Sequence, residues 1–143
     1  MTQEERMLLI KDLSARLPYA VTVEHTSGFR GTLHDMTVHH MYDDNDNVYD
    51  AICYTDFFGD EDSIYIEYFK PYLFPLSSMT EEQKKELQEL HFDYISDEIV
   101  NDIEFVYHYD CTNLIDWLNK NHFDYRGLIE KGLAIDATGL NVY

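Results

Sequence analysis

Three short elements pair a histidine with an aspartate two residues later. An imidazole beside a carboxylate can bind a metal ion or transfer a proton. The elements are His91-Phe92-Asp93, His108-Tyr109-Asp110 and His122-Phe123-Asp124. Convergence of these groups on one pocket would indicate a metal-dependent enzyme. We favour the simpler interpretation, in which the aromatic ring packs inward, the aspartate caps a helix and the histidine lies at the surface.

The acidic stretch that begins at Asp43 superficially resembles a calcium-binding loop. With Asp43 in the first position, Val48 occupies the position that requires glycine, and Tyr54 occupies that of the bidentate glutamate. An EF-hand is therefore excluded, and weak binding of divalent ions by clustered carboxylates is left open.

Zinc-type ligand residues occur on neighbouring expected strands. They are His34, His39, His40 and Cys53. Their spacing matches no closed structural zinc site, so we interpret the histidines as surface residues. The sequence also contains no phosphate-binding loop, dinucleotide fingerprint or nucleophile elbow. We therefore expect no catalytic residues, no metal and no cofactor, and we expect that the protein is not an enzyme.

The charge of the chain is its strongest indication of function. Its 143 residues include 28 acids but only 10 lysines and arginines, which gives a formal net charge of -18. Such a chain repels nucleic acid and anionic membranes, which carry the same sign of charge. The excess is regional. Ten acids and no base lie between Arg30 and Lys70, and nine acids and no base lie between Lys85 and Lys120.

Tyrosines accompany both acidic stretches, and tyrosine supplies rigid contact area at interfaces. Acids two residues apart on a strand stand roughly 6–7 Å from each other, a spacing similar to that of neighbouring phosphates. We therefore expect the acidic faces to bind a basic host protein, one that handles nucleic acid or acts in defence, in the sharpest form as a nucleic-acid mimic. The expected partner-binding residues are Asp43, Asp44, Asp46, Asp60, Glu61 and Asp62.

Two other interpretations of the acidic, aromatic surface stay open. Core aromatics under a solvated acidic shell would produce the same composition without any partner. A structural or assembly protein that oligomerises through its aromatic surface would also fit.

The elements that must position these residues indicate an α+β fold in a single domain, 1–143. A capping box at Thr2 and Glu5 and an apolar three- and four-residue spacing predict a helix that Pro18 ends, over 1–17. Residues 19–69 change to a period of two and predict a four-stranded antiparallel meander, which could close into a small barrel. Residues 80–132 are expected to be mainly helical.

Finer expectations follow from local residues. Ser27-Gly28 predicts a tight turn, and Ile64 to Phe69 predicts the fourth strand. Pro71 and Pro75 predict an extended crossing segment over 70–76. The C-terminal part is expected to hold a helix over 112–121 and a last short helix, capped by Asp124 and ended by Gly132.

Two segments carry a resemblance. KPYLFPLSSMTEE (70–82) and HFDYRGLIEKGLA (122–134) resemble segments of small proteins of gut anaerobes, their phages and mobile elements. The resemblance implies a phage or mobile-element origin and no particular activity. Phe74 stands where those segments carry arginine, so no role of that arginine is implied here.

Location is inferred from what the sequence lacks. It has no run of about 18 apolar residues that could cross a membrane. Its start is acidic and polar, unlike a signal peptide. Cys53 and Cys111 are too few for a disulfide scaffold. We therefore expect a cytoplasmic protein with reduced thiols.

Overall fold

The computed structural model describes residues 1–42, 47–56, 64–91 and 112–143. The described α-helices are α1 (Gln3–Arg16), α2 (Glu81–His91) and α5 (Thr112–Lys120). The strands are β1 (Thr22–His25), β2 (Arg30–Tyr42), β3 (Asn47–Thr55), β4 (Ile64–Tyr65), β5 (Phe69–Pro75), β6 (Phe123–Asp124) and β7 (Ile135–Asp136). Short 3-10 turns follow α1, β4 and β5 as η1 (Leu17–Tyr19), η2 (Ile66–Tyr68) and η3 (Leu76–Ser78). The α+β class predicted from the sequence is confirmed.

Helix α1 begins where the sequence places it. The Thr2 hydroxyl accepts a hydrogen bond from the Glu5 amide, and the Glu5 carboxylate accepts one from the Thr2 amide. This capping box satisfies two amides that the first turn would otherwise leave unpaired. Pro18 then lies inside η1, directly after the helix. The predicted start and end of the first helix are confirmed.

The predicted antiparallel meander is present in strands β1 to β4. Each of these strands pairs antiparallel with the next one along the chain. The turn between β1 and β2 contains Gly28 at φ +88°, a left-handed conformation that suits glycine. Strand β4 is shorter than the predicted 64–69, because η2 occupies Ile66–Tyr68.

The sheet continues beyond the meander and does not close. Its strand order is β4-β3-β2-β1-β5-β6, with β7 also paired to β5. Strand β5 pairs antiparallel with β1 and parallel with β6 and β7. The alternative of a small barrel is therefore wrong, since β4 and β6 lie at opposite ends of this order and the sheet is open.

The segment predicted as a crossing connection is strand β5 itself. Proline lacks an amide donor and is therefore expected at a sheet edge or strand end. In β5, Pro71 faces Val23 of β1, whereas pairing with β7 begins only at Tyr72. Pro75 is the last residue of the strand. Both prolines thus stand where a missing donor is tolerated.

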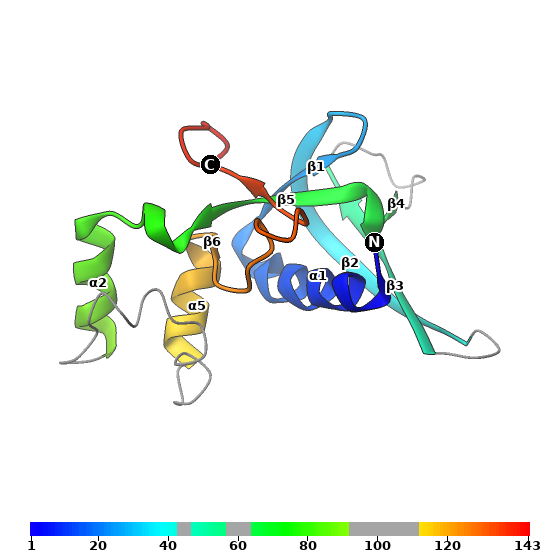
Figure 1. Cartoon of the computed structure of the whole chain (residues 1–143), viewed down its shortest axis with the longest axis horizontal. Helices are drawn as coiled ribbons and strands as arrows, with labels where there is room; N and C mark the ends of the chain where they lie inside the picture. The colour runs from blue at the N-terminus through cyan, green and yellow to red at the C-terminus, as the bar shows by residue number, and fades with distance from the viewer. Residues whose placement is uncertain (43–46, 57–63, 92–111) are drawn as a thin grey trace.

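Two hydrophobic clusters form the described core. The first lies between α1 and the sheet and includes Leu9 and Leu13 from the helix and Leu33 and Cys53 from the strands. The second joins α2, α5 and β6 through Leu87, Trp117 and Phe123, and the Trp117 and Phe123 rings stack at 5.6 Å. Figure 1 shows α1 and most of the sheet toward one end of the molecule and α2 and α5 toward the other, with β5 running between them.

Residues 80–132 were expected to be mainly helical; residues 92–111 of this range lie outside the described residues, and the described residues after α5 are less helical than predicted. Helix α2 has the capping box of Thr80 and Gln83, and α5 matches the helix predicted over 112–121. The last short helix, from Asp124 to Gly132, is wrong: β6 and a series of turns occupy it. Gly127 and Gly132 adopt φ of +70° and +68°, which interrupts any right-handed helix there.

Candidate functional site

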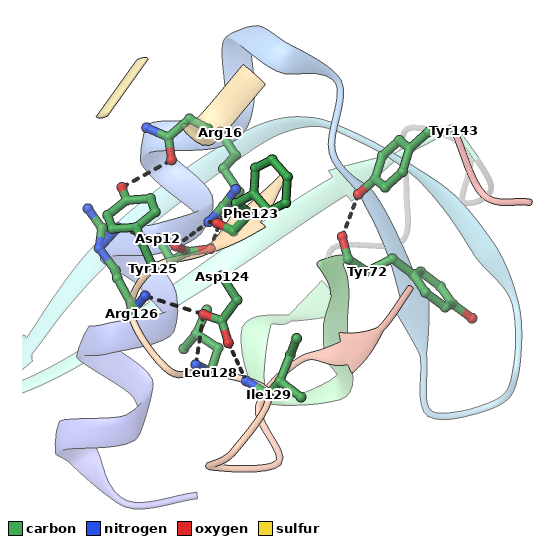
Figure 2. Close-up of polar contacts among 11 residues, drawn as sticks. Asp12, Arg16, Tyr72, Phe123, Asp124, Tyr125, Arg126, Leu128, Ile129 and Tyr143 are labelled. Atoms are coloured by element: carbon green, nitrogen blue, oxygen red, sulfur yellow. Dashed lines mark hydrogen bonds and ion pairs between the residues drawn. The ribbon is translucent and has the colours of Figure 1, made fainter. Parts of the chain in front are cut away.

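A buried ion pair within α1 anchors the C-terminal segment. Arg16 donates from Nε to Asp12 Oδ2 at 2.7 Å and from Nη2 to Asp12 Oδ1 at 3.0 Å. The two residues are one helical turn apart, and both side chains are fully buried. Arg16 Nη2 also donates to the Phe123 carbonyl at 2.8 Å, as Figure 2 shows. The pair therefore ties α1 to β6.

A second arginine reaches the same carboxylate from the far end of the chain. Arg126 Nη1 lies 3.3 Å from Asp12 Oδ1, and its side chain is 8% exposed. The Tyr125 ring lies near both guanidiniums, 4.7 Å from Arg126 and 5.6 Å from Arg16. The Tyr125 hydroxyl donates to Asn119 Oδ1 of α5 at 3.0 Å. We call Asp12, Arg16, Tyr125 and Arg126 the ionic junction.

Asp124 organises the backbone beside the ionic junction. Its carboxylate accepts the amides of Leu128 at 2.9 Å, Ile129 at 2.8 Å and Arg126 at 3.3 Å (Figure 2). Hydrogen bonds from backbone amides to a carboxylate are stronger than those between neutral groups. The predicted capping role of Asp124 is thus present, although the segment that it caps is a turn.

His122 is neutral and packed beneath the chain's last residue. Its ring stacks on the Tyr143 ring at 3.8 Å with 6° between the planes. Burial, and then the nearby positive charge of Arg16, lower the pKa of His122 to about 4. The Tyr143 hydroxyl donates to the Tyr72 carbonyl at 2.5 Å, which attaches the C-terminal residues to β5 (Figure 2).

The ionic junction is built for structure. Asp12 and Arg16 have no exposed surface, so no substrate can reach them. Among the described residues, Arg16 Nη1 and Arg126 Nε are buried donors without a hydrogen-bond acceptor, and the buried His122 Nδ1 has no hydrogen-bond partner. Donors thus outnumber acceptors there, and Asp12 is the carboxylate that both guanidiniums share. The arrangement therefore holds together three segments that are distant in the sequence: α1, α5 and residues 123–126.

A further arginine pairs with acids at the other end of α1. Arg6 Nη1 lies 2.7 Å from Asp50 Oδ2, and Arg6 Nη2 lies 2.8 Å from Glu67 Oε2. Asp50 is buried, and the Arg6 side chain is 16% exposed. This bridge connects α1 to β3 and to η2.

The buried charges of the described residues balance. The buried carboxylates are Asp12, Asp50 and Asp124. The arginines whose side chains are at most 16% exposed are Arg6, Arg16 and Arg126. Three negative groups thus stand against three positive ones, although Asp124 binds backbone amides and not an arginine side chain. The buried groups of the described residues consequently contribute nothing to the net charge of -18.

One exposed face of the sheet brings together tyrosines and an acid. Directly opposed residues of paired strands share a face, as do alternate residues of one strand. Tyr54 opposes Asp35, and Ile52 opposes both Thr37 and Tyr65. The residues on the other face of the same strands, Leu33, Ala51 and Cys53, are buried in the cluster under α1. We call Asp35, Thr37, Ile52, Tyr54 and Tyr65 the tyrosine face.

The tyrosine face is accessible. Tyr65 is 48% exposed and Tyr54 is 36% exposed, Asp35 and Thr37 are exposed, and Ile52 is half-buried. Asp56, directly after β3, is exposed and accepts the Thr32 amide at 2.8 Å. Tyr54 and Tyr65 are thus large side chains that contact solvent beside acidic groups.

The tyrosines of the sheet differ in role. Tyr72 is buried on β5 and donates to Glu24, which also accepts Arg30 Nε at 2.9 Å. The hydrogen bond from Tyr72 lowers the pKa of Glu24, whereas burial, followed by the bond to Glu24, raises the pKa of Tyr72 to about 12. Tyr72 is therefore a structural residue, in contrast to Tyr54 and Tyr65.

The six expected partner-binding residues lie outside the described residues. They are Asp43, Asp44, Asp46, Asp60, Glu61 and Asp62. Of the His-aromatic-Asp elements, the structure describes the side chains of His122 and Asp124. His122 stacks on Tyr143, and Asp124 binds backbone amides, so the two have separate structural roles. Phe123 packs inward as expected, but the expectation that the histidine lies at the surface is wrong for His122, which is buried.

The zinc-type residues are dispersed. His34 and His39 are exposed on β2, whereas Cys53 is buried, and burial raises the pKa of its thiol to about 12. Across residues 1–42, 47–56, 64–91 and 112–143, no group of three histidines, cysteines or acids is placed to hold a metal ion. Within the same residues, no helix combines the length and apolar character that crossing a membrane requires.

Sequence reasoning missed the ionic junction. The four-residue separation of Asp12 and Arg16 is a visible signal for an ion pair on one helix face. Arg126 had no such signal, because 114 residues separate it from Asp12. The comparisons with known proteins are negative: no family model, curated protein or solved structure matches this chain.

Proposed function

We propose that the chain is a small, non-enzymatic, acidic accessory protein of phage or mobile-element type that binds a basic surface of another protein. In its more specific version, the proposal is that the protein mimics nucleic acid and inhibits a host defence or DNA-handling protein. The observation that supports this proposal is the excess of acids in the sequence: 28 acids against 10 lysines and arginines give a net charge of -18, whereas the buried charges of the described residues balance. A surface of this sign attracts cationic partners over about one Debye length, roughly 8–10 Å.

The arrangement of exposed acids supports the same proposal. Glu82, Glu86 and Glu89 are exposed on α2 at steps of four and three residues. Such steps place side chains about 5–6 Å apart along one helix face. This spacing is comparable to that of successive phosphates on a strand of DNA, so the acids of α2 could occupy positions in a phosphate-binding groove.

The test is a tagged pull-down from nuclease-treated bacterial lysate at low and at high salt, with mass spectrometry of the bound proteins. We expect a basic nucleic-acid-handling protein that is retained at low salt and released at high salt, because salt screens charge attraction. Recovery of the bait alone would contradict the proposal. Mimicry adds one expectation: a DNA duplex should displace the captured protein, since both would use the same groove.

A further inference from the structure

The strands that carry the tyrosine face have no positive side chain other than histidine after Arg30. No lysine or arginine occurs until Lys70, which covers the rest of β2 and all of β3 and β4. The acids beside the face, Asp35 and Asp56, are exposed. Beyond Arg30, which begins β2 and pairs with Glu24, a basic partner would therefore meet no lysine or arginine on these strands. This is electrostatic complementarity of the kind that guides docking.

Tyr54 and Tyr65 supply what an acidic surface alone lacks. Exposed tyrosines offer rigid apolar contact area, and their rings attract guanidinium groups placed over them. Carboxylates accept the paired donors of arginine in a planar fork, which lysine cannot reproduce. Tyrosine rings next to Asp35 and Asp56 thus match an arginine side chain better than a lysine side chain.

We propose that the tyrosine face is the docking surface for an arginine-rich surface of a partner protein. The proposal rests on the proposed function and names the part of the molecule that performs it. Tyr54 and Tyr65 serve as the anchors, and Asp35 and Asp56 pair with guanidinium groups around them. On the opposite face of the same strands, Leu33, Ala51 and Cys53 are buried in the cluster under α1.

The experiment measures binding of a fluorescent nonaarginine peptide by anisotropy at low salt. Tyr54→Ala and Tyr65→Ala leave the net charge unchanged, so a purely electrostatic attraction would not respond to them. We expect each to weaken binding at least about fivefold, as truncation of an interface anchor does. A nonalysine peptide of the same charge should bind the wild-type protein more weakly than nonaarginine.

Tyr68→Ala is the matched control. Tyr68 lies three residues from Tyr65 and is similarly exposed, at 42%, but it belongs to η2 and its ring lies 5.9 Å from that of His25. We expect this variant to keep the wild-type affinity. Far-UV circular dichroism and thermal melting of all three variants establish that they fold.

Amide chemical shifts of the isotope-labelled wild-type protein give a second readout that needs no variant. Added nonaarginine should shift the amides of Thr37, Ile52 and Tyr65 and leave those of α5 unmoved. One outcome would contradict the docking surface alone: the wild-type protein binds the peptide, Tyr54→Ala and Tyr65→Ala have the same affinity as Tyr68→Ala, and the amides of α2 shift. The proposed function would then stand without this docking surface. If the wild-type protein does not bind at all, both fail.

Discussion

The ionic junction and the tyrosine face differ in where their charged groups lie: the junction buries its charges in pairs, and the face exposes its acid to solvent. In the junction, two arginines share Asp12, a tyrosine ring packs beside them and Arg16 is fully buried. On the face, Asp35 and two tyrosines contact solvent, and their strands hold no lysine or arginine beyond Arg30. In the junction, arginines are thus intramolecular partners of a buried acid, whereas the strands of the face expose Asp35 and provide no lysine or arginine beyond Arg30.

This difference separates residues that stabilise the fold from residues available to a partner. A buried charge requires a partner of opposite sign, because removal from water is costly. An exposed acid has no such requirement, and exposed like charges reduce stability through mutual repulsion. Substitutions in the two regions should therefore affect different measurements, folding in the first and binding in the second.

The largest expected effect comes from Asp12→Ala. This change leaves two guanidiniums buried without their shared carboxylate, and loss of one partner of a buried pair costs about 3–5 kcal/mol. Urea unfolding at neutral pH measures the loss of unfolding free energy. Asp116→Ala, an exposed acid of α5, is the control and should change stability by less than about 0.5 kcal/mol. Equal effects of the two changes would show that the junction does not stabilise the fold.

The next effect concerns pH and His122. The folded pKa of His122, about 4, lies below the ordinary value of 6.5, so the unfolded state binds the proton more readily. Stability contributed by the neutral ring is therefore complete above about pH 6.5 and is lost as the pH falls toward 4. Urea unfolding at several pH values should show this loss in the wild-type protein.

His122→Asn is the companion variant for the pH measurement. Asparagine tolerates the φ of +58° at this position and does not titrate. The variant should be less stable at neutral pH, since the stack on Tyr143 is lost, but its stability should fall less steeply between pH 6.5 and 4. An unchanged slope would mean that His122 is not the group responsible.

A smaller effect is expected from Arg126→Gln. Arg126 makes one contact of 3.3 Å with Asp12, whereas Arg16 makes two shorter ones and also binds the Phe123 carbonyl. Loss of Arg126 should cost about 1.5–3 kcal/mol of unfolding free energy, the range for a hydrogen bond to a charged group. Arg16→Gln should cost more in the same unfolding assay. The reverse order would contradict the bonding described for the junction.

The smallest effect on folding is expected from Tyr65→Ala. Because the side chain is 48% exposed, unfolding free energy should change by no more than about 0.5 kcal/mol. The same variant is expected to weaken binding to the arginine peptide. A large loss of stability would show that Tyr65 belongs to the core, and the contrast between the two regions would disappear.

Local patterns in the sequence predicted much of the fold. The capping box at Thr2, the helix over 112–121 and the four-strand meander all depend on residues close together in the chain. The parallel pairs of β5 were not predictable in this way. Phe74 pairs with Phe123 and Tyr72 with Ile135, contacts between segments that share no local signal.

The sequence indicated which residue types the candidate site contains, but not which face of the sheet carries it. The run without lysine or arginine and the accompanying tyrosines were visible in the sequence, and Tyr54 and Tyr65 were among those tyrosines. Alternation along a strand assigns residues to two faces but does not say which face a helix will cover. Only the packing of α1 on Leu33, Ala51 and Cys53 identifies the face of Tyr54 and Tyr65 as the open one.

Strand β5 has a consequence for how the molecule melts. Leu73 belongs to the cluster under α1, and its neighbour Phe74 packs against the cluster formed by α2, α5 and β6. Consecutive residues of β5 therefore belong to the two clusters. Unfolding of β5 in one cluster would disturb the packing of the other. Trp117, the single tryptophan of the chain, lies in the second cluster. Its fluorescence and far-UV circular dichroism should consequently report one shared, cooperative melting transition.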